Sequence, residues 1–343
     1  MKVKIRLIVI MSVFGLALQS CKKIDRLKTD INFPAAYVIN GESNSISVIN
    51  IETNSVVETA EFHKGSWPHH IYSNSSKDKL VISLTGVDLS GGHAGHGGAA
   101  KSFLIVLNAV NFEVEGFLKT DAVAHNAIFM NSDQEIWLPQ MTENGEIKIL
   151  NSKSLKEISS IGVGNGPLEI TVNSTGNFVF VANGEDNTIS IIDVATKTVT
   201  KTINVGIEPV GAWPGSNNKM YVDCEVSKQI FEIDATTLEI TDTINLAYTP
   251  AYVNYNSLTT ELWVSDAQFG GIHTYELISN QWVENGFLPT GDNAHAITFN
   301  TLNDKAYVTN QNSATVSVID AVLLTKIADV VVGNKPNGIL IIE

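Results

Sequence analysis

Apolar residues recur at every second position in short runs along most of this chain, and the runs return at a nearly constant interval. The clearest copy is AYVTNQNSATVSVIDA at residues 306–321. Related runs are centred on Tyr37, Val81, Trp137, Phe180, Tyr221, Trp263 and Tyr307. Most steps between these centres are about 41 to 44 residues, which is the period of a four-stranded propeller blade.

Each copy predicts four strands. A second alternating run follows the first, as in TISIIDV at 188–194, and its β-branched residues suit a strand with one buried face. An Asp or Asn with a Thr three positions later then marks a tight turn, as at Asp193 and Thr196. A third run follows, and a fourth apolar run comes after a polar turn that often contains Pro.

Counting the strands predicts how the ring closes. Runs of the fourth type begin near Pro68, His125, Pro167, Pro209, Pro250, Ala294 and Pro336. The pattern starts with a Tyr-Val strand and stops after 336–342, so we expect the last strand to complete the first blade. Such pairing would cover two free sheet edges that otherwise invite aggregation. The predicted fold is all-β, a seven-bladed propeller of four-stranded antiparallel blades.

The repeats resemble the YVTN family of seven-bladed β-propellers. The resemblance rests on AYVIN at 36–40, FVFVAN at 178–183 and AYVTN at 306–310, and it covers about residues 36 to 342. It implies one propeller domain over residues 36–343. The repeat pattern is specific for the fold and says little about function.

The first twenty residues are typical of an export signal. Three basic residues precede an apolar run at 7–18, and Ser20 precedes Cys21. The segment resembles a bacterial lipoprotein signal at 1–20 whose following Cys21 becomes lipidated, with an ordinary signal peptide as the alternative. Residues 21–35 would then be the lipidated cysteine and a tether. This places the expected protein in the bacterial cell envelope, on the periplasmic face or the outer surface, held to the membrane through lipid alone.

Composition narrows the range of partners. The net charge is −14, and removing the three positive residues of the signal lowers it to −17, which argues against nucleic acid. Only Cys21 and Cys224 are present, so lipidation of the first leaves no internal disulfide. Signatures of nucleotide-binding loops, serine hydrolases and common zinc proteases are absent.

The second repeat carries an insertion, TGVDLSGGHAGHGGAAK, at residues 85–101. Its glycines cannot pack a core, so the segment is either a functional loop or a surface decoration. His93 and His96 favour a function, because a plain linker needs only Gly and Ser.

The histidines map onto one face of the predicted ring. Four lie at the starts of inner strands beside the channel, and the insertion belongs to the same face. Imidazole is the commonest side-chain metal ligand, and nitrogen ligands suit copper or zinc. The predicted metal ligands are His69, His70, His93, His96, His125 and His295, with Glu169 as an added carboxylate. The alternative is that these side chains line a polar channel without a metal.

The sequence therefore predicts a cell-envelope lipoprotein that captures a metal ion, or a small metal-containing ligand, at the channel mouth. An envelope transporter or a redox protein would be its partner. Two alternatives stay open: a propeller enzyme of the lactonase or oxidoreductase type, and a protein-interaction scaffold. No catalytic residue is assigned, because no pair of carboxylates has a readable spacing and Cys224 has no neighbouring base in the sequence.

Overall fold

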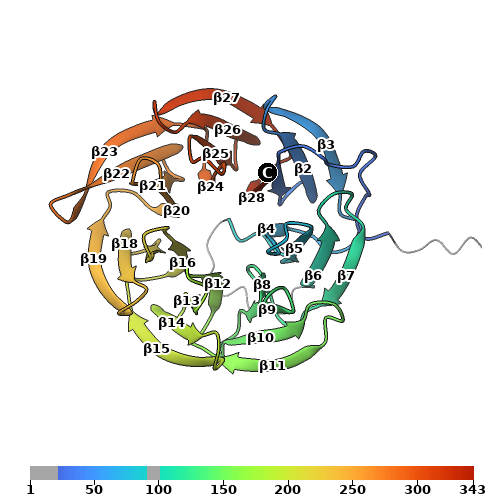
Figure 1. Cartoon of the computed structure of the whole chain (residues 1–343), viewed down its shortest axis with the longest axis horizontal. Coiled ribbons are helices and arrows are strands. Elements are labelled where there is room, and N and C mark those ends of the chain that lie inside the picture. Colours follow the sequence, from blue (N-terminus) through green and yellow to red (C-terminus); the bar gives the residue numbers. More distant parts are fainter. Residues whose placement is uncertain (1–21, 91–100) are drawn as a thin grey trace, which may run out of the picture.

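The computed structural model describes residues 22–90 and 101–343 as a closed ring of seven four-stranded antiparallel sheets (Figure 1). The predicted fold is confirmed. Cys21, His93 and His96 lie outside the described residues. Within the described part of the chain, no helix is long and apolar enough to cross a membrane.

The first blade joins both ends of the propeller. From the channel outward it contains β28 (Pro336–Ile342), β1 (Ala35–Asn40), β2 (Ser45–Asn50) and β3 (Ser55–Glu61). Strand β28 pairs antiparallel with β1, with Ala35 opposite Ile342. The expected closure by the last strand is therefore confirmed.

The other six blades follow in chain order, each running from the channel to the rim. The second and third contain β4 (Pro68–Ser73), β5 (Lys79–Leu84), β6 (Phe103–Asn108) and β7 (Val114–Lys119), then β8 (Ile128–Met130), β9 (Glu135–Gln140), β10 (Glu146–Asn151) and β11 (Glu157–Gly162). The fourth and fifth contain β12 (Pro167–Val172), β13 (Phe178–Asn183), β14 (Thr188–Asp193) and β15 (Thr198–Asn204), then β16 (Pro209–Pro214), β17 (Lys219–Cys224), β18 (Gln229–Asp234) and β19 (Glu239–Asn245). The last two contain β20 (Pro250–Asn256), β21 (Glu261–Asp266), β22 (Gly271–Ile278) and β23 (Gln281–Pro289), then β24 (Ala294–Phe299), β25 (Lys305–Asn310), β26 (Thr315–Asp320) and β27 (Thr325–Val331).

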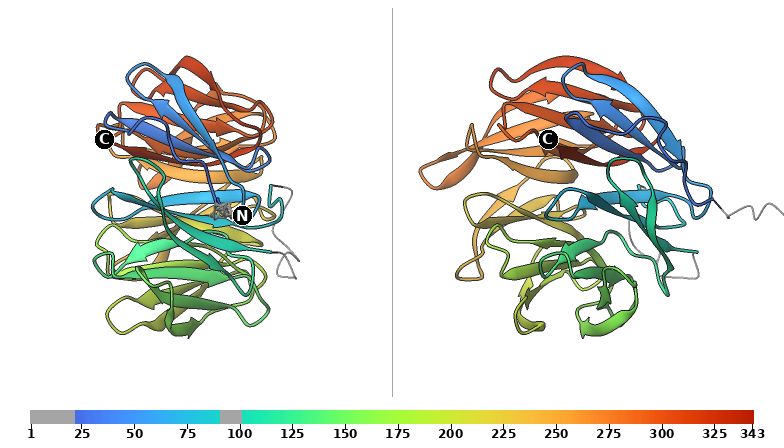
Figure 2. Two further views of the ribbon diagram at one scale, coloured as in Figure 1. Left: turned by 90° about the vertical axis from the view of Figure 1, so that its right-hand side faces the viewer. Right: turned by 45° about the vertical axis from the view of Figure 1, so that its right-hand side comes forward.

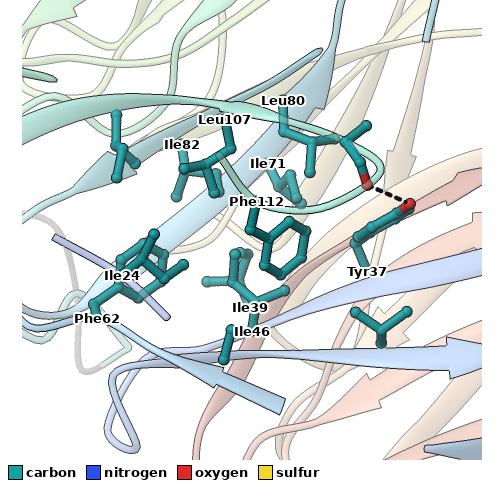
Figure 3. Packing of buried hydrophobic residues seen from close by; sticks show 14 of the residues in the cluster. Ile24, Tyr37, Ile39, Ile46, Phe62, Ile71, Leu80, Ile82, Leu107 and Phe112 are labelled. Carbon is teal, nitrogen blue, oxygen red and sulfur yellow. Dashed lines mark hydrogen bonds between the residues drawn. The ribbon is translucent and has the colours of Figure 1, made fainter. Parts of the chain in front are cut away.

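The second strand of each blade is buried on both faces because it lies between neighbouring blades. The residue at its centre is at most 2% exposed in every blade, and these residues are Tyr37, Val81, Trp137, Phe180, Tyr221, Trp263 and Tyr307. The Tyr37 hydroxyl donates to the carbonyl oxygen of Ala109 in the next blade, 2.9 Å away (Figure 3). The repeated aromatic position thus packs one blade against the next.

Residues 22–34, the segment expected to act as a tether, pack against the first two blades. Ile24, Leu27 and Ile31 are buried in one apolar cluster, which also contains Phe62 and Phe112 (Figure 3). Ile24 forms a β-bridge with Phe62, and the backbone nitrogen of Leu27 donates to Asn111. The segment covers apolar surface that strand pairing leaves open.

The seven inner strands all run in the same direction, since each follows the same outward order of strands. Seen from the side, the strands extend between the two faces of the ring (Figure 2). The face where the inner strands begin is called the N-face, and the face where they end is called the C-face. Residues at equivalent positions of different inner strands therefore meet at the same depth of the channel.

Candidate metal centre in the channel

Two adjacent histidines point into the channel because the strand that carries them is bulged. On β4, Pro68 pairs with Leu84 and Ile71 pairs with Ile82, so three steps on β4 oppose two on β5. A bulge breaks the alternation that would send neighbouring side chains to opposite faces. The rings of His69 and His70 stack with their centroids 4.5 Å apart.

His125 reaches this pair from the next blade, where it lies just before β8. Its ring centroid is 4.4 Å from that of His69 and 5.0 Å from that of His70. One nitrogen from each of the three rings can be chosen so that all three atoms lie within 4.8 Å of one another. All three side chains are buried. The structure thus brings together three of the predicted ligands.

Glu169 lies behind His125, on the inner strand β12. The Nδ1 atom of His125 is 2.7 Å from Oε2 of Glu169, and Nε2 of His70 is 3.7 Å from the same oxygen. The other carboxylate oxygen accepts hydrogen bonds from Asn126, at 2.8 Å, and from the Tyr72 hydroxyl. The carboxylate is fully buried and holds the histidines in place from the side.

This carboxylate has an unusual proton affinity. Burial raises the pKa of Glu169 well above its usual range, the Tyr72 hydrogen bond opposes the rise, and nearby Asp223 adds to it. Burial also raises the pKa of Tyr72. Burial therefore favours the protonated form of the Glu169 carboxyl group, which lies against His125.

His295 occupies the channel but stands apart from the three clustered rings. Its centroid is 6.2 Å from that of His70, and its Nδ1–H donates to the Asn337 carbonyl oxygen at 3.0 Å. Burial lowers the pKa of His295 to about 4, so the ring is neutral at physiological pH. His295 would contact a ligand in the channel more readily than an ion held by the other three.

The last inner strand presses against the bulge. A Cβ atom on Gly338 would lie 2.7 Å from the His69 carbonyl oxygen and 3.1 Å from the His70 Cα atom. Only glycine allows β28 to approach β4 this closely. Ring closure therefore also fixes the backbone that carries the two histidines.

The remaining two histidines of the described chain are engaged elsewhere. His63 pairs with Asp25, with the Nε2 and Oδ1 atoms 2.9 Å apart. Both ring nitrogens of His273 contact carboxylates, Asp266 at 3.2 Å and Glu284 at 2.8 Å. Neither belongs to the channel cluster.

Sequence reasoning missed the polar residues that support the cluster. Asn126 follows His125 and clamps Ile170 of β12 through two hydrogen bonds, and Tyr72 follows His70 by two positions on β4. An alignment of the inner strands could have identified these residues. Asn126 occupies the same position in the third blade as His70 in the second blade. Aligning bulges as well as apolar residues would have identified both.

A cavity of about 410 Å³ opens from the clustered histidines toward the N-face. His69 and His295 line it, together with Glu208, Glu225 and Lys228. Burial raises the pKa of Glu225 to about 8, with the neighbouring carboxylates of Asp223 and Glu208 adding to the rise. This N-face cavity is open to a polar small molecule, which would contact His69 and His295 there.

No known family profile matches the chain, and no curated protein matches it by sequence. Several solved structures match the chain by fold. A periplasmic gluconolactonase from Pseudomonas aeruginosa matches with a TM-score of 0.74 and 14% identity, over 90% of this chain and 99% of that one. A putative 6-phosphogluconolactonase from Bacteroides fragilis matches with a TM-score of 0.72 and 11% identity, over 91% and 99%. Hydrazine synthase from Kuenenia stuttgartiensis matches with a TM-score of 0.66 and 14% identity, over 80% and 90%. At such identities the likeness concerns the fold, and this chain shares the seven-bladed propeller architecture with these proteins.

Proposed function

We propose that the protein binds one copper or zinc ion at His69, His70 and His125. The observation that carries this proposal is the convergence of three imidazoles whose ligand atoms lie within 4.8 Å of one another. Nitrogen ligands without thiolates favour these metals over magnesium or calcium. Three protein ligands leave a coordination position for water or a substrate.

The contact between His125 and Glu169 supports the same proposal. Histidines that bind metals usually donate their other ring N–H to a carboxylate, which orients the ring and makes it a better ligand. With Nδ1 of His125 facing Glu169, coordination would use Nε2. Glu169 would thus act on the metal through His125, instead of serving as the ligand expected from the sequence.

The site would operate at the cell envelope, with Cys21 as the lipid attachment point. The N-face cavity would admit a hydrated ion or a small metal-containing ligand to the buried histidines. A protein that captures metal in this way would pass it to an envelope transporter or a redox partner.

The second candidate is hydrolysis of a sugar lactone. One solved structure with this fold is named a periplasmic gluconolactonase and another a putative 6-phosphogluconolactonase. The polar N-face cavity is suited to a hydroxylated ring. A metal held by His69, His70 and His125 would supply Lewis-acid chemistry, polarising a carbonyl oxygen and activating water. Addition of water to the lactone carbonyl, with cleavage of the ring C–O bond, would give the hydroxy acid. Glu225, with its pKa of about 8, would accept and return the proton near neutral pH.

Elemental analysis of protein purified without a His-tag tests the first candidate. We expect about one copper or zinc per chain, which His125→Ala loses and the distant His273→Ala retains. Metal-free protein after purification and after incubation with either ion would contradict it. Hydrolysis of glucono-1,5-lactone, measured in the same samples by the acid that it releases, tests the second candidate. Activity that disappears when the metal is removed supports this candidate. Hydrolysis at the uncatalysed rate in every sample rejects it.

A further inference from the structure

A second cavity lies at the opposite end of the channel from the clustered histidines. It has a volume of about 280 Å³ and opens at the C-face. On β4, Tyr72 and Ser73 line it, and they follow His69 and His70 along the same strand. Its other aromatic walls are Phe129, Trp213 and Tyr252. This space is called the C-face cavity.

Its largest aromatic wall is held rigidly. The Trp213 Nε1–H donates to Oδ1 of Asp223 at 2.6 Å, and the centroid of its ring is 3.8 Å from that of Tyr252. A Cβ atom on Gly211 would lie 2.4 Å from the indole, so glycine makes room for the ring to fold back over its own strand. A ligand therefore meets a fixed aromatic surface and loses little free energy in ordering it.

The lining of the C-face cavity also selects by charge. None of the described residues that line it is acidic, basic or histidine, and its polar groups are hydroxyls and an amide, such as Thr171 and Asn254. The N-face cavity differs, because Glu208, Glu225 and Lys228 border it. Transferring an ion into an uncharged, largely aromatic site is costly, so the C-face cavity favours neutral molecules.

We infer that the C-face cavity binds an uncharged planar molecule of one or two aromatic rings that carries a hydroxyl or carbonyl group. The ring would stack on the Trp213–Tyr252 wall, where aromatic pairs gain attraction beyond simple burial. Hydroxyl and amide groups at Thr171 and Asn254 would receive its polar edge. The volume of the cavity is at the small end for ligand pockets, which limits the molecule to this size.

Tyr72 connects this cavity to the histidines. Its ring lines the C-face cavity, its hydroxyl donates to Glu169, and Glu169 contacts His125. A ligand that shifts Tyr72 would move the hydrogen bond that holds Glu169 against His125. This coupling rests on the proposed metal site, and by reciprocity metal would change ligand affinity by the same factor.

Calorimetry on the metal-free full chain tests the cavity by itself. We expect 2-naphthol to bind and 2-naphthalenesulfonate, which has the same rings and a charge, to bind at least about tenfold more weakly. Tyr252→Leu removes half of the Trp213–Tyr252 wall and should weaken 2-naphthol about tenfold. Phe287→Ala, at an exposed position on the outer strand β23, should leave the affinity unchanged. Equal binding of the two probes, or full affinity in Tyr252→Leu, overturns the inference.

A zinc titration with and without saturating 2-naphthol tests the coupling. We expect the zinc affinity to change severalfold in the parent protein and to stay constant in Tyr72→Phe, which keeps the ring and loses the hydrogen bond to Glu169. Unchanged zinc affinity in the parent contradicts the coupling. If zinc does not bind at all, the proposed metal site fails, while the 2-naphthol result still decides the C-face cavity.

Discussion

The Nδ1 atom of His125 lies 2.7 Å from Oε2 of Glu169, a residue 44 positions later on the inner strand of the next blade. One blade period therefore separates a candidate metal ligand from the carboxylate that orients it. The closed ring fixes both backbones, so the arrangement needs no metal to form. We expect little ordering cost when an ion binds.

Glu169→Gln should weaken zinc binding by about 10- to 100-fold, because an amide cannot accept a proton from His125 as a carboxylate does. The amide oxygen can still accept from Asn126 and Tyr72, which limits damage to the fold. Zinc calorimetry at pH 7 measures the change, with the exposed Glu276→Gln as the matched control. Zinc affinity equal to that of the parent would show that Glu169 has no role in metal binding.

Asp223→Asn should alter the dependence of stability on pH. Burial raises the pKa of Asp223 from its usual 3.8 to about 7, so between these values the folded chain keeps a proton that the unfolded chain releases. Stability of the parent therefore falls as the pH rises through this window. The amide of Asp223→Asn keeps the hydrogen bond to Trp213 and has no such proton. As the pH rises through this window, the free energy of unfolding of the variant should therefore increase relative to that of the parent, by up to about 4 kcal/mol.

Urea unfolding of metal-free protein at pH 5, 6 and 8 measures this difference. Asp292→Asn, at an exposed loop position, is the control and should follow the parent at each pH. A difference between Asp223→Asn and the parent that stays constant with pH would contradict the burial effect.

Ile24→Ala should lower the free energy of unfolding by about 2 to 5 kcal/mol, because the side chain is only 3% exposed within the cluster that seals the first two blades. Ile207→Ala is the matched control, since that isoleucine is 54% exposed. Equal stability of the two variants would show that residues 22–34 contribute no packing in solution.

Cys21→Ser should move the protein from the membrane fraction to the soluble fraction of cells. The lipid proposed on this cysteine would hold the protein at the membrane surface. Fractionation followed by immunoblotting measures the distribution. Membrane association that survives the substitution would require another anchor.

The repeats were sufficient to predict the blades, the closure by β28 and the meeting of His69, His70 and His125 in the channel, because strand alternation and period depend on local sequence. The bulge at His69 and His70 could not be predicted from strand alternation, since it depends on how β4 pairs with β5. For the same reason the sequence grouped His295 with the others, whereas its bond to Asn337 holds it to one side.

The packing of residues 22–34 was not predicted, also because it depends on distant residues. Ile24, Leu27 and Ile31 have the i, i+3, i+7 spacing of a helical face, but no helix forms here, so this spacing did not predict their burial against the blades. These side chains are buried by tertiary contacts, in a cluster that includes Phe62 and Phe112.

Zinc and copper(II) calorimetry on His70→Ala and His295→Ala tests the central claim most directly. Both residues were predicted as ligands, yet the geometry groups only His70 with His69 and His125. We expect the parent to bind one ion per chain at pH 7, His70→Ala to lose more than about a hundredfold in affinity, and His295→Ala to stay within severalfold of the parent. Parent-like binding by His70→Ala, or an equal loss in both variants, would contradict the three-histidine site.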